Sequence, residues 1–311
     1  MPRIAILDLG TNTFNLLIAE KDEQGKVVFI YSKELPVEIG KGGIHKREIT
    51  PEATNRAARA LHKHRQTMHE YNVDEYYAFA TSAVRDAANG KDFTRRMRIE
   101  TGIEIKILTG DEEAEWIYEG VRQASVLGKD PAVIMDIGGG STEFIIADEN
   151  EIFWKKSYPL GVSRLYEIFH PADPIITKKE EVEQHILTML QDMFEAAKTY
   201  KPIELIGSSG SFDSFAEMII HRTSSAEKAV NGFEYPLDEF EKLYNDILVS
   251  TVDERLQMPG LIQMRAPMFA YSVILTDITL KALSIKKMKL SRYAMKEGIA
   301  NRLLGRGPAG I

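Results

Sequence analysis

Two short segments of this chain place an acid at the end of an apolar run and a glycine turn directly after it. Residues 6–13 have the sequence ILDLGTNT and residues 134–143 have the sequence IMDIGGGSTE. Glycine reaches positive φ and lets backbone N–H groups approach an anion closely, and Thr, Ser and Asn side chains add further donors. Two copies of one device indicate a phosphate held between two related domains. The residues predicted to bind it are Gly10, Thr11 and Asn12 in the first turn and Gly138, Gly139, Gly140 and Ser141 in the second.

The apolar pattern after each turn shows which elements position these residues. Phe14, Leu16 and Ile18 follow the first turn at every second position, and Phe144 and Ile146 follow the second turn in the same way. Period two is typical of a strand, so each turn is predicted to be the tip of a hairpin. Walker loops and dinucleotide fingerprints lead into a helix instead. Glycine at one hairpin is often only turn chemistry, but chance accounts poorly for a duplicated Asp-x-Gly turn.

A third turn, with the sequence GSSGS at residues 207–211, precedes a helical pattern over residues 213–220. The N-terminus of a helix carries unpaired N–H groups and a positive dipole end, which suit an anion. We therefore predict that Gly207, Ser208 and Ser209 also bind phosphate. A plain capped loop explains the same residues equally well.

The composition limits the class of protein. The chain has 311 residues, which predicts two domains, and 44% hydrophobic with 27% charged residues predicts a globular protein. A net charge of −7 argues against general nucleic-acid binding, so an anion must be held by local donors. The absence of cysteine excludes disulfides, thiolate zinc sites and cysteine nucleophiles. The N-terminal apolar run is too short for a signal peptide and no apolar stretch is long enough to span a membrane, so a cytoplasmic protein without membrane contact is expected.

The order of predicted elements repeats along the chain. We expect a first domain over residues 1–120 and a second over 121–311, with the last helices free to pack back on the first. The C-terminal residues are expected to be mainly helical. Predicted strands are 4–8, 13–19, 27–33, 75–80 and 103–108, then 132–136, 143–147, 151–158 and 204–206; predicted helices include one from Pro51 to about His69 and others near 161–169 and 178–199.

These motifs resemble the exopolyphosphatase and guanosine pentaphosphate phosphohydrolase (Ppx/GppA) family, within the superfamily of actin, sugar kinases and chaperone ATPases. The resemblance implies an α/β fold of two actin-like (ribonuclease H-like) domains, with duplicated mixed sheets and an interdomain cleft. Motifs in this order span nearly the whole chain. The segments that carry the resemblance are residues 8–13, 80–89, 110–114 and 136–143, with looser matches at 207–211 and 296–298.

The resemblance also implies an activity, which is hydrolysis of a terminal phosphoanhydride with Mg²⁺ or another divalent cation such as Mn²⁺. The substrate would be inorganic polyphosphate or guanosine pentaphosphate, the latter a nucleotide of the stringent response. By the same resemblance, Glu113 and Glu143 match the glutamates that activate the attacking water, Arg85 matches the arginine on the substrate phosphate, and Asp136 matches the carboxylate near the metal. Asp8 and Glu143 complete the candidate metal ligands.

The chemistry of phosphoanhydride hydrolysis calls for these residue types. The reaction needs an in-line water and neutralisation of phosphate charge, with little covalent work by the protein. Carboxylates supply a base and metal ligands, and a guanidinium binds phosphate through two parallel hydrogen bonds. The candidate side chains are all predicted at or just beyond strand ends, where ligands bind in open α/β sheets. They are Asp8, Arg85, Glu113, Asp136 and Glu143.

Each candidate also has a structural explanation. Glu113 falls in the first turn of a helix, where acids are favoured by the dipole, Glu143 opens a strand and could face water, and Arg85 could be a surface charge. His62, His64 and His69 share one helix without a metal-binding motif. Lysines 286, 287 and 289 are more typical of a solvated face than of a polyanion track.

Two alternative functions stay open at this point. An ATP-using enzyme on the same fold is one alternative, and a sensor that binds polyphosphate or guanosine penta/tetraphosphate without cleaving it is another, although a pure binder gains nothing from acids beside a polyanion. A homodimer is compatible with the sequence. Three positions depart from the family pattern: Glu38 replaces an arginine, Pro267 replaces an aspartate and Ser211 replaces a threonine.

Overall fold

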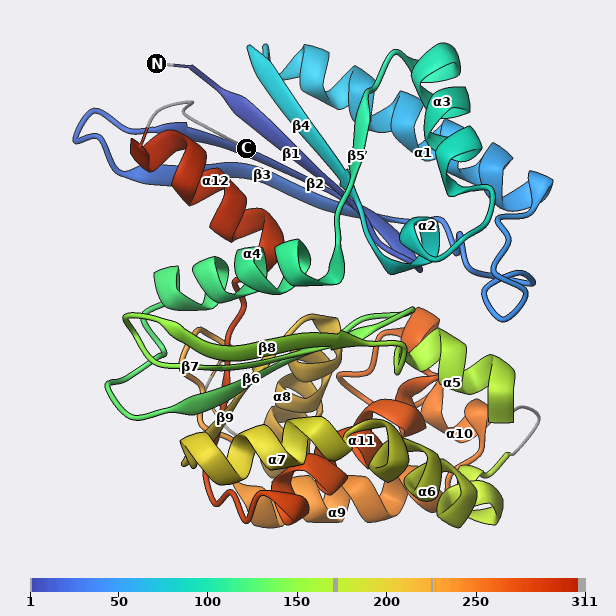
Figure 1. Cartoon of the computed structure of the whole chain (residues 1–311), viewed down its shortest axis with the longest axis vertical. Coiled ribbons are helices and arrows are strands. Elements are labelled where there is room, and N and C mark those ends of the chain that lie inside the picture. The colour runs from blue at the N-terminus through green and yellow to red at the C-terminus, as the bar shows by residue number, and fades with distance from the viewer. Residues whose placement is uncertain (1, 170–172, 225, 227, 307–311) are drawn as a thin grey trace. The chain divides into compact units, whose positions relative to one another are not determined.

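The computed structural model describes residues 2–169, 173–224, 226 and 228–306. The chain divides into two compact units: the first comprises Met1–Gly120 with Met295–Ile311, and the second comprises Val121–Ala294. Among the described residues, no helix combines the length and apolar character needed to cross a membrane. Each unit contains one five-stranded mixed sheet with helices packed on it (Figure 1).

The first sheet has the strand order β3-β2-β1-β4-β5. The hairpins β1–β2 and β2–β3 are antiparallel, whereas β4 and β5 run parallel to β1, and the ladder is irregular between Ile18 and Ala19. The turn after β1 is therefore a hairpin tip, as the apolar period predicts. The strands are β1 Ile4–Leu9, β2 Thr13–Lys21, β3 Val27–Pro36, β4 Glu75–Ala80 and β5 Ile105–Ile107.

Helices cover both faces of the first sheet (Figure 1). Leu7 and Leu9 pack with Ala57 and Leu61 of α1 in one buried cluster. Because side chains alternate along a strand, Asp8 lies on the opposite face, where α12 contacts β1, β2 and β3. Thr50 caps α1 by accepting from the Ala53 N–H group. The helices of this unit are α1 Pro51–Glu70, α2 Ser82–Arg85, α3 Gly90–Thr101, α4 Gly110–Gln123, which continues past Gly120, and α12 Met295–Arg306.

The second sheet repeats the plan of the first, with the order β10-β9-β6-β7-β8. The β6–β7 and β7–β8 pairs are antiparallel, and β9 and β10 are parallel to β6. The ladder is again irregular, between Ile146 and Ala147. The sequence separation from Asp136 to this irregularity equals the separation from Asp8 to the irregularity at Ile18 and Ala19. The predicted α/β class with duplicated mixed sheets is confirmed. The strands are β6 Ala132–Ile137, β7 Thr142–Ala147, β8 Ile152–Tyr158, β9 Glu204–Ser208 and β10 Met288–Leu290.

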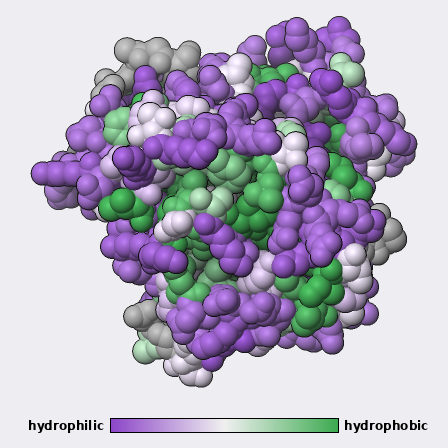
Figure 2. Space-filling model, turned by 60° about the horizontal axis from the view of Figure 1, so that its bottom comes forward, coloured by the Kyte–Doolittle hydropathy of each residue, from purple (hydrophilic) through white to green (hydrophobic). Residues whose placement is uncertain are grey.

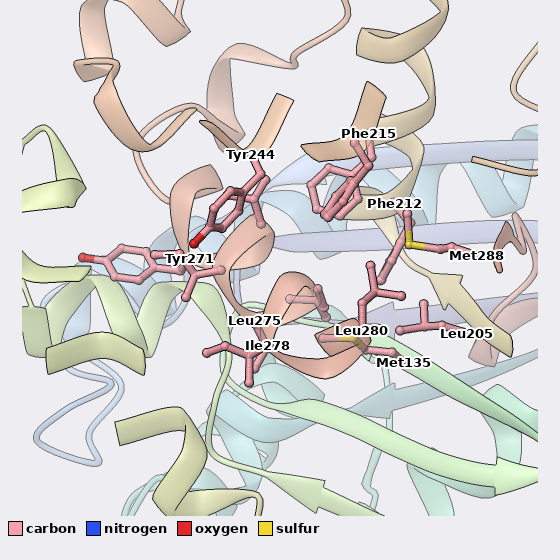
Figure 3. Packing of buried hydrophobic residues seen from close by; sticks show 14 of the residues in the cluster. Met135, Leu205, Phe212, Phe215, Tyr244, Tyr271, Leu275, Ile278, Leu280 and Met288 are labelled. Atoms are coloured by element: carbon pink, nitrogen blue, oxygen red, sulfur yellow. The ribbon is translucent and has the colours of Figure 1, made fainter. Parts of the chain in front are cut away.

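The second unit buries one face of its sheet under helices. Figure 3 shows part of this core, where Met135 of β6 and Leu205 of β9 lie near side chains of α8 and α11. In the space-filling view, hydrophilic side chains cover most of the face shown and apolar groups gather near its middle (Figure 2). The helices are α5 Val162–Phe169, η1 Ile175–Lys178, α6 Lys179–Met189, α7 Gln191–Tyr200, α8 Gly210–Thr223, α9 Leu237–Val249, α10 Val252–Arg255, η2 Gln263–Arg265 and α11 Phe269–Ala282.

One expectation about this unit is wrong. The single helix predicted near 178–199 is divided at Leu190 into α6 and α7. Asp192 explains the division, because its carboxylate accepts from the Met193 N–H group and from the Tyr158 hydroxyl on β8. The C-terminal part is mainly helical, as predicted, and it also contains the short strand β10, Met288–Leu290.

Candidate active site

The two glycine turns have the same hydrogen-bond geometry. The Gly10 N–H group donates to the Thr13 carbonyl at 3.0 Å, and the Gly138 N–H group donates to the Ser141 carbonyl at 3.0 Å. In both turns, a carbonyl that follows the glycine accepts from a neighbouring segment. The Asn12 carbonyl, two residues after Gly10, accepts from Val37 and Glu38, and the Gly139 carbonyl, one residue after Gly138, accepts from Ser163 and Arg164. The duplication seen in the sequence is thus a duplication of three-dimensional structure.

The carbonyls of the second turn point at the start of α5. Gly138 accepts from the Val162 N–H group at 3.0 Å, and Gly140 accepts from Arg164 Nε at 3.0 Å. Within the ranges that the structure describes, no residue accepts a hydrogen bond from the N–H group of Gly139 or Gly140. These two amides are therefore suited to an anion.

Gly161 lets α5 approach this turn. A Cβ atom at position 161 would lie 2.4 Å from backbone atoms of Gly139 and Gly140. Only glycine fits there without displacing the turn. The sequence did not indicate a role for Gly161. Glycine is required there by the turn at Gly139 and Gly140, which lies more than twenty positions earlier in the sequence.

A row of polar residues crosses the second sheet next to the turn. Asp136 on β6 is opposite Glu143 on β7, Glu143 is opposite Ser157 on β8, and Asp136 is also opposite Ser208 on β9. Residues that are directly opposite in a sheet place their side chains on one face. The sheet therefore collects two carboxylates and two hydroxyls at one edge, beside the glycine turn.

Glu143 is buried, with 1% of its surface exposed. Its Oε1 atom accepts from Ser141 Oγ at 2.7 Å and from Ser157 Oγ at 2.6 Å. Hydroxyl-to-carboxylate bonds of this length are among the stronger hydrogen bonds in proteins. Ser141, predicted as a phosphate ligand, thus binds the carboxylate of Glu143 in this structure, and Ser157 is a site residue that sequence reasoning missed.

The corresponding row in the first sheet has different chemistry. Asn15 is opposite Asp8, where the second sheet has Glu143, and Glu34 is opposite Asn15, where the second sheet has Ser157. Asn15 Nδ2 donates to Asp8 Oδ2 at 3.3 Å. Burial raises the pKa of Asp8 to about 6, against the lowering effects of Lys296 and the Asn15 hydrogen bond. The first sheet therefore keeps the aspartate of this row but has Asn15 at the position that corresponds to Glu143.

The third turn is joined to the second. Ser209 Oγ donates to the Ile137 carbonyl at 2.9 Å, which ties residues 207–209 to the strand that carries Asp136. The Ser209 backbone has φ 77° and ψ 172°, a region that only glycine adopts readily. Arg265 lies against the start of α8, where a Cβ on Gly210 would meet its guanidinium at 2.0 Å, and its Nη1 donates to Ser214 Oγ at 3.0 Å. A cation and a helix N-terminus are thus both present beside this turn.

Arg85 and Glu113 form a second group, in the first unit. Arg85 Nη1 donates to Glu113 Oε2 at 2.6 Å, and to the Leu108 carbonyl at 3.4 Å. Their side chains are 18% and 10% exposed. Arg85 ends the short helix α2, and Glu113 lies in the first turn of α4. The helix dipole favours an acid in the first turn, but it does not account for the buried ion pair of Glu113 with Arg85.

The donor set beside the second turn suits a divalent cation. Mg²⁺ usually binds one or two carboxylates and completes its coordination with water and substrate phosphate oxygens. Asp136 and Glu143 supply two carboxylates on facing positions of one hairpin. In the described part of the chain, no group of three or more His, Cys, Asp or Glu side chains is placed to hold a metal. The residues therefore fit a cation shared with a phosphate better than a cage made by protein alone.

Two charged features of the sequence have local partners. Lys289 Nζ lies 2.9 Å from Glu204 Oε2, and Lys287 lies within 4 Å of Glu204 and Glu234, so this cluster is largely neutralised. Glu38, the acid in place of the family's arginine, pairs with Lys41 at 2.9 Å.

Comparisons with known proteins show which family the chain belongs to. Residues 17–306 match the model of the Ppx/GppA phosphatase family. Exopolyphosphatase 1 of Mycobacterium tuberculosis is 26% identical over 311 residues, covering 97% of this chain and 88% of the relative. The crystal structure of an exopolyphosphatase from Cytophaga hutchinsonii is 36% identical, covers 97% of this chain and 98% of that one, and superposes with a TM-score of 0.94.

A more distant solved structure shows that the fold is retained at lower identity. The Ppx/GppA family member of Aquifex aeolicus is 20% identical, covers 99% of both chains and has a TM-score of 0.80. With the family match extending over most of the sequence, the chain belongs to the Ppx/GppA phosphatase family.

Proposed function

We propose that this chain is an exopolyphosphatase, which hydrolyses the terminal phosphoanhydride of inorganic polyphosphate and releases orthophosphate. The observation that carries the proposal is one hairpin that combines a buried carboxylate, Glu143, with the N–H groups of Gly139 and Gly140. A base beside an anion-binding turn is the arrangement that phosphoanhydride hydrolysis requires. Relatives named exopolyphosphatase, matched over nearly the whole chain, support polyphosphate as the substrate.

In the proposed reaction, Glu143 is the general base. It takes a proton from water while the water oxygen forms a bond to the terminal phosphorus. The bond between that phosphorus and the bridging oxygen breaks, and the bridging oxygen leaves with its electron pair on a polyphosphate one unit shorter. The amides of the glycine turn and the N-terminus of α8 bind the phosphate oxygens, where charge is spread in the transition state.

The first unit supplies two further groups. Arg85 is proposed to bind a substrate phosphate through its guanidinium, and Glu113 to orient the attacking water. The ion pair between them supports a shared role, because it fixes both side chains in one geometry. Gly10, Thr11 and Asn12 are proposed to bind phosphate through the first turn.

We propose Mg²⁺ or Mn²⁺ as the cofactor. Asp136 and Glu143 would hold the cation, with Asp8 as a further candidate ligand. A bound divalent cation would neutralise negative charge on phosphate oxygens. The cysteine-free composition is consistent with a reducing cytoplasm.

The experiment is phosphate release from polyphosphate, guanosine pentaphosphate and ATP, with Mg²⁺ and with a chelator, by the wild-type protein and by Glu143→Gln. Loss of a general base is expected to lower kcat roughly 100-fold or more, with the fold and the binding of polyphosphate retained. Glu151→Gln is the matched control, because Glu151 is an exposed acid near the start of β8 and should not affect turnover.

The three substrates separate the alternatives. Release from guanosine pentaphosphate alone would reassign the substrate, and release from ATP alone would favour an ATP-using enzyme on this fold. Binding of polyphosphate without release from any substrate would favour a sensor. Full activity of Glu143→Gln on polyphosphate would remove Glu143 from its proposed role.

A further inference from the structure

The three carbonyl groups of the second glycine turn all bind the start of α5. The first two accept from backbone N–H groups of the helix, and the third accepts from the side chain of Arg164. Three successive peptide groups of the turn are thus held by one helix. The pairs are Val162 N–H with the Gly138 carbonyl at 3.0 Å, Ser163 N–H with the Gly139 carbonyl at 2.8 Å, and Arg164 Nε with the Gly140 carbonyl at 3.0 Å.

The direction of these carbonyls fixes the direction of the N–H groups. In a planar trans peptide, the C=O bond and the N–H bond point in opposite directions. Among the described residues only the bond between Asp173 and Pro174 is cis, so the peptides of the turn are trans. Each carbonyl bound to α5 therefore directs the N–H group of the next residue away from α5. Those N–H groups belong to Gly139, Gly140 and Ser141.

Three successive N–H groups on one side of a turn form a concave surface that suits an anion. Within the parts of the chain that the structure describes, none of the three donates to a protein acceptor. The hydroxyl of Ser141 binds Glu143, so Ser141 would bind a phosphate through its backbone N–H group. The role predicted for Ser141 thus moves from its side chain to its main chain.

The third carbonyl differs from the others because a side chain holds it. In the first turn, the Asn12 carbonyl accepts from the backbone N–H groups of Val37 and Glu38. Contacts between backbone groups do not depend on the side chain at either position. The contact between Arg164 Nε and the Gly140 carbonyl does, so a substitution at position 164 can remove it without changing the backbone.

We infer that Arg164 is a positioning residue, whose Nε–H group holds the Gly140 carbonyl so that the Ser141 N–H group faces the substrate phosphate. The N–H groups of Gly139 and Gly140 complete the set of three donors. This inference rests on the proposed function, because phosphate is the anion that the turn would bind. Arg164 acts through the turn, and its Nε atom does not touch the substrate.

The test compares two neutral substitutions of similar length. In Arg164→Gln the side-chain amide nitrogen stands the same number of bonds from Cα as Nε does, so the variant keeps a donor there and loses the charge. Arg164→Met places a methyl group at that point and loses both. We expect Arg164→Met to lower kcat/KM for polyphosphate about tenfold, the size of one hydrogen bond to a charged group, and Arg164→Gln to lower it less than about twofold.

Arg164→Lys tests the charge by itself. Lysine keeps the positive charge, but a methylene group stands where Nε was, and the ammonium lies one bond further out. The positioning role predicts that Arg164→Lys loses activity as Arg164→Met does. If Arg164→Met does not fold, Arg164→Lys takes its place as the variant without a donor at this point.

A second readout does not need turnover. Titration with orthophosphate should change the amide NMR shifts of Gly139, Gly140 and Ser141 in the wild type and in Arg164→Gln. In Arg164→Met the change at Ser141 should be the one most reduced, because its peptide is the one released.

Arg65→Met is the matched control. Arg65 Nη1 donates to the Thr101 carbonyl at 2.6 Å, so this variant also loses a bond between a guanidinium and a backbone carbonyl. Both residues belong to the first unit and have no proposed role at the site. Kinetics and the three amide shifts should therefore stay as in the wild type.

The outcomes separate this inference from the proposed function. A wild-type protein that is inactive on all substrates would overturn the proposed function, whatever the amide shifts show. An active wild type with unchanged kcat/KM and an unchanged Ser141 response in Arg164→Met would overturn only the role of Arg164. Equal losses in Arg164→Gln and Arg164→Met, with activity kept in Arg164→Lys, would also overturn it, because the charge would then be the cause.

Discussion

At the scale of single residues, the pair of Arg85 and Glu113 links stability to binding. The pair is short, at 2.6 Å, and both side chains are mostly shielded from water. In Arg85→Ala the Glu113 carboxylate would lose its guanidinium partner. We expect the free energy of unfolding to fall by about 2 kcal/mol. We also expect KM for polyphosphate to rise and kcat to fall together. Denaturant unfolding and steady-state kinetics measure the two effects.

Arg96→Ala provides the comparison for that variant. Arg96 Nε lies 2.6 Å from Glu100 Oε1, the same separation, but the side chains are 43% and 36% exposed. An exposed pair contributes less than about 1 kcal/mol, so this variant should unfold almost as the wild type does and keep its kinetics. Equal losses in both variants would contradict the importance of burial at Arg85.

Asp8 makes a prediction about pH. Its pKa in the folded protein is raised to about 6 by burial, from an ordinary value of 3.8. Between these values the folded state holds the proton more tightly than the unfolded state, so stability is lost as pH rises from about 4 to above 6. Asp8→Asn removes this loss, and the variant should become more stable than the wild type by on the order of 2 kcal/mol at pH 8 but not at pH 4. Urea unfolding in metal-free buffer across this range is the measurement, and a difference independent of pH would contradict it.

His64 has the opposite effect, so the difference between Asp8→Asn and wild type is more informative than either curve. Burial lowers the pKa of His64, whose Nε2 lies 3.0 Å from the Phe14 carbonyl. A group that is held neutral in the folded state contributes stability above its unfolded pKa of about 6.5, and this stability is lost as pH falls below that value. The two contributions partly cancel in the wild type.

The site residues differ in how far the sequence could reveal them. Asp136, the glycine turn and Glu143 are adjacent in the sequence, so their types and spacing were enough to group them. Ser157 was invisible to that reasoning, because only the register of β7 against β8 places it beside Glu143. Arg85 was predicted to bind substrate, but its ion pair with Glu113 depends on how α2 and α4 pack and has no sequence signal.

At the scale of elements, α12 packs closely on α4 through one glycine. A Cβ atom on Gly298 would lie 2.3 Å from the Trp116 carbonyl oxygen and 2.6 Å from the Gly120 nitrogen. We expect Gly298→Ala to destabilise the protein by about 1 to 3 kcal/mol, because backbone atoms cannot move aside without separating the helices. Thermal or denaturant unfolding measures the change.

Gly305→Ala is the control within the same helix. Nothing lies within 4 Å of a Cβ at Gly305, so the variant should gain helix propensity and unfold with a free energy higher by at most about 1 kcal/mol. A loss in both variants would show that helix α12 tolerates no side chain at either position, and that the contact with α4 is not the cause.

Long periodic elements were predictable and short or tertiary ones were not. The hairpins around Asp8 and Asp136 follow from apolar residues at every second position, and α1 follows from its cap and proline. The division between α6 and α7 could not be predicted, because it depends on Asp192 accepting from Tyr158 on a distant strand. Strand β10 has only three residues and is defined by its pairing with β9.

At the scale of the whole molecule, an acidic protein must bind a polyanion through local donors. The net charge is −7, so long-range attraction cannot supply the affinity. If the glycine turns bind phosphate, polyphosphate with Mg²⁺ should stabilise the inactive Glu143→Gln variant by about 2.7 kcal/mol at a concentration 100 times Kd. A thermal-shift titration measures this, and an unchanged Tm for the variant and the wild type at saturating polyphosphate would contradict binding.

The return of α12 to the first unit has a consequence for synthesis on the ribosome. Ile299, Ala300 and Leu304 of α12 are buried, and the helix covers a face of β1, β2 and β3. Those strands emerge from the ribosome long before α12 is translated, and their apolar face stays uncovered in the meantime. The second unit is continuous in sequence and can complete its core earlier. The part of the protein that is made first is therefore the part that finishes folding last, and a nascent chain halted before α12 would present that face to chaperones.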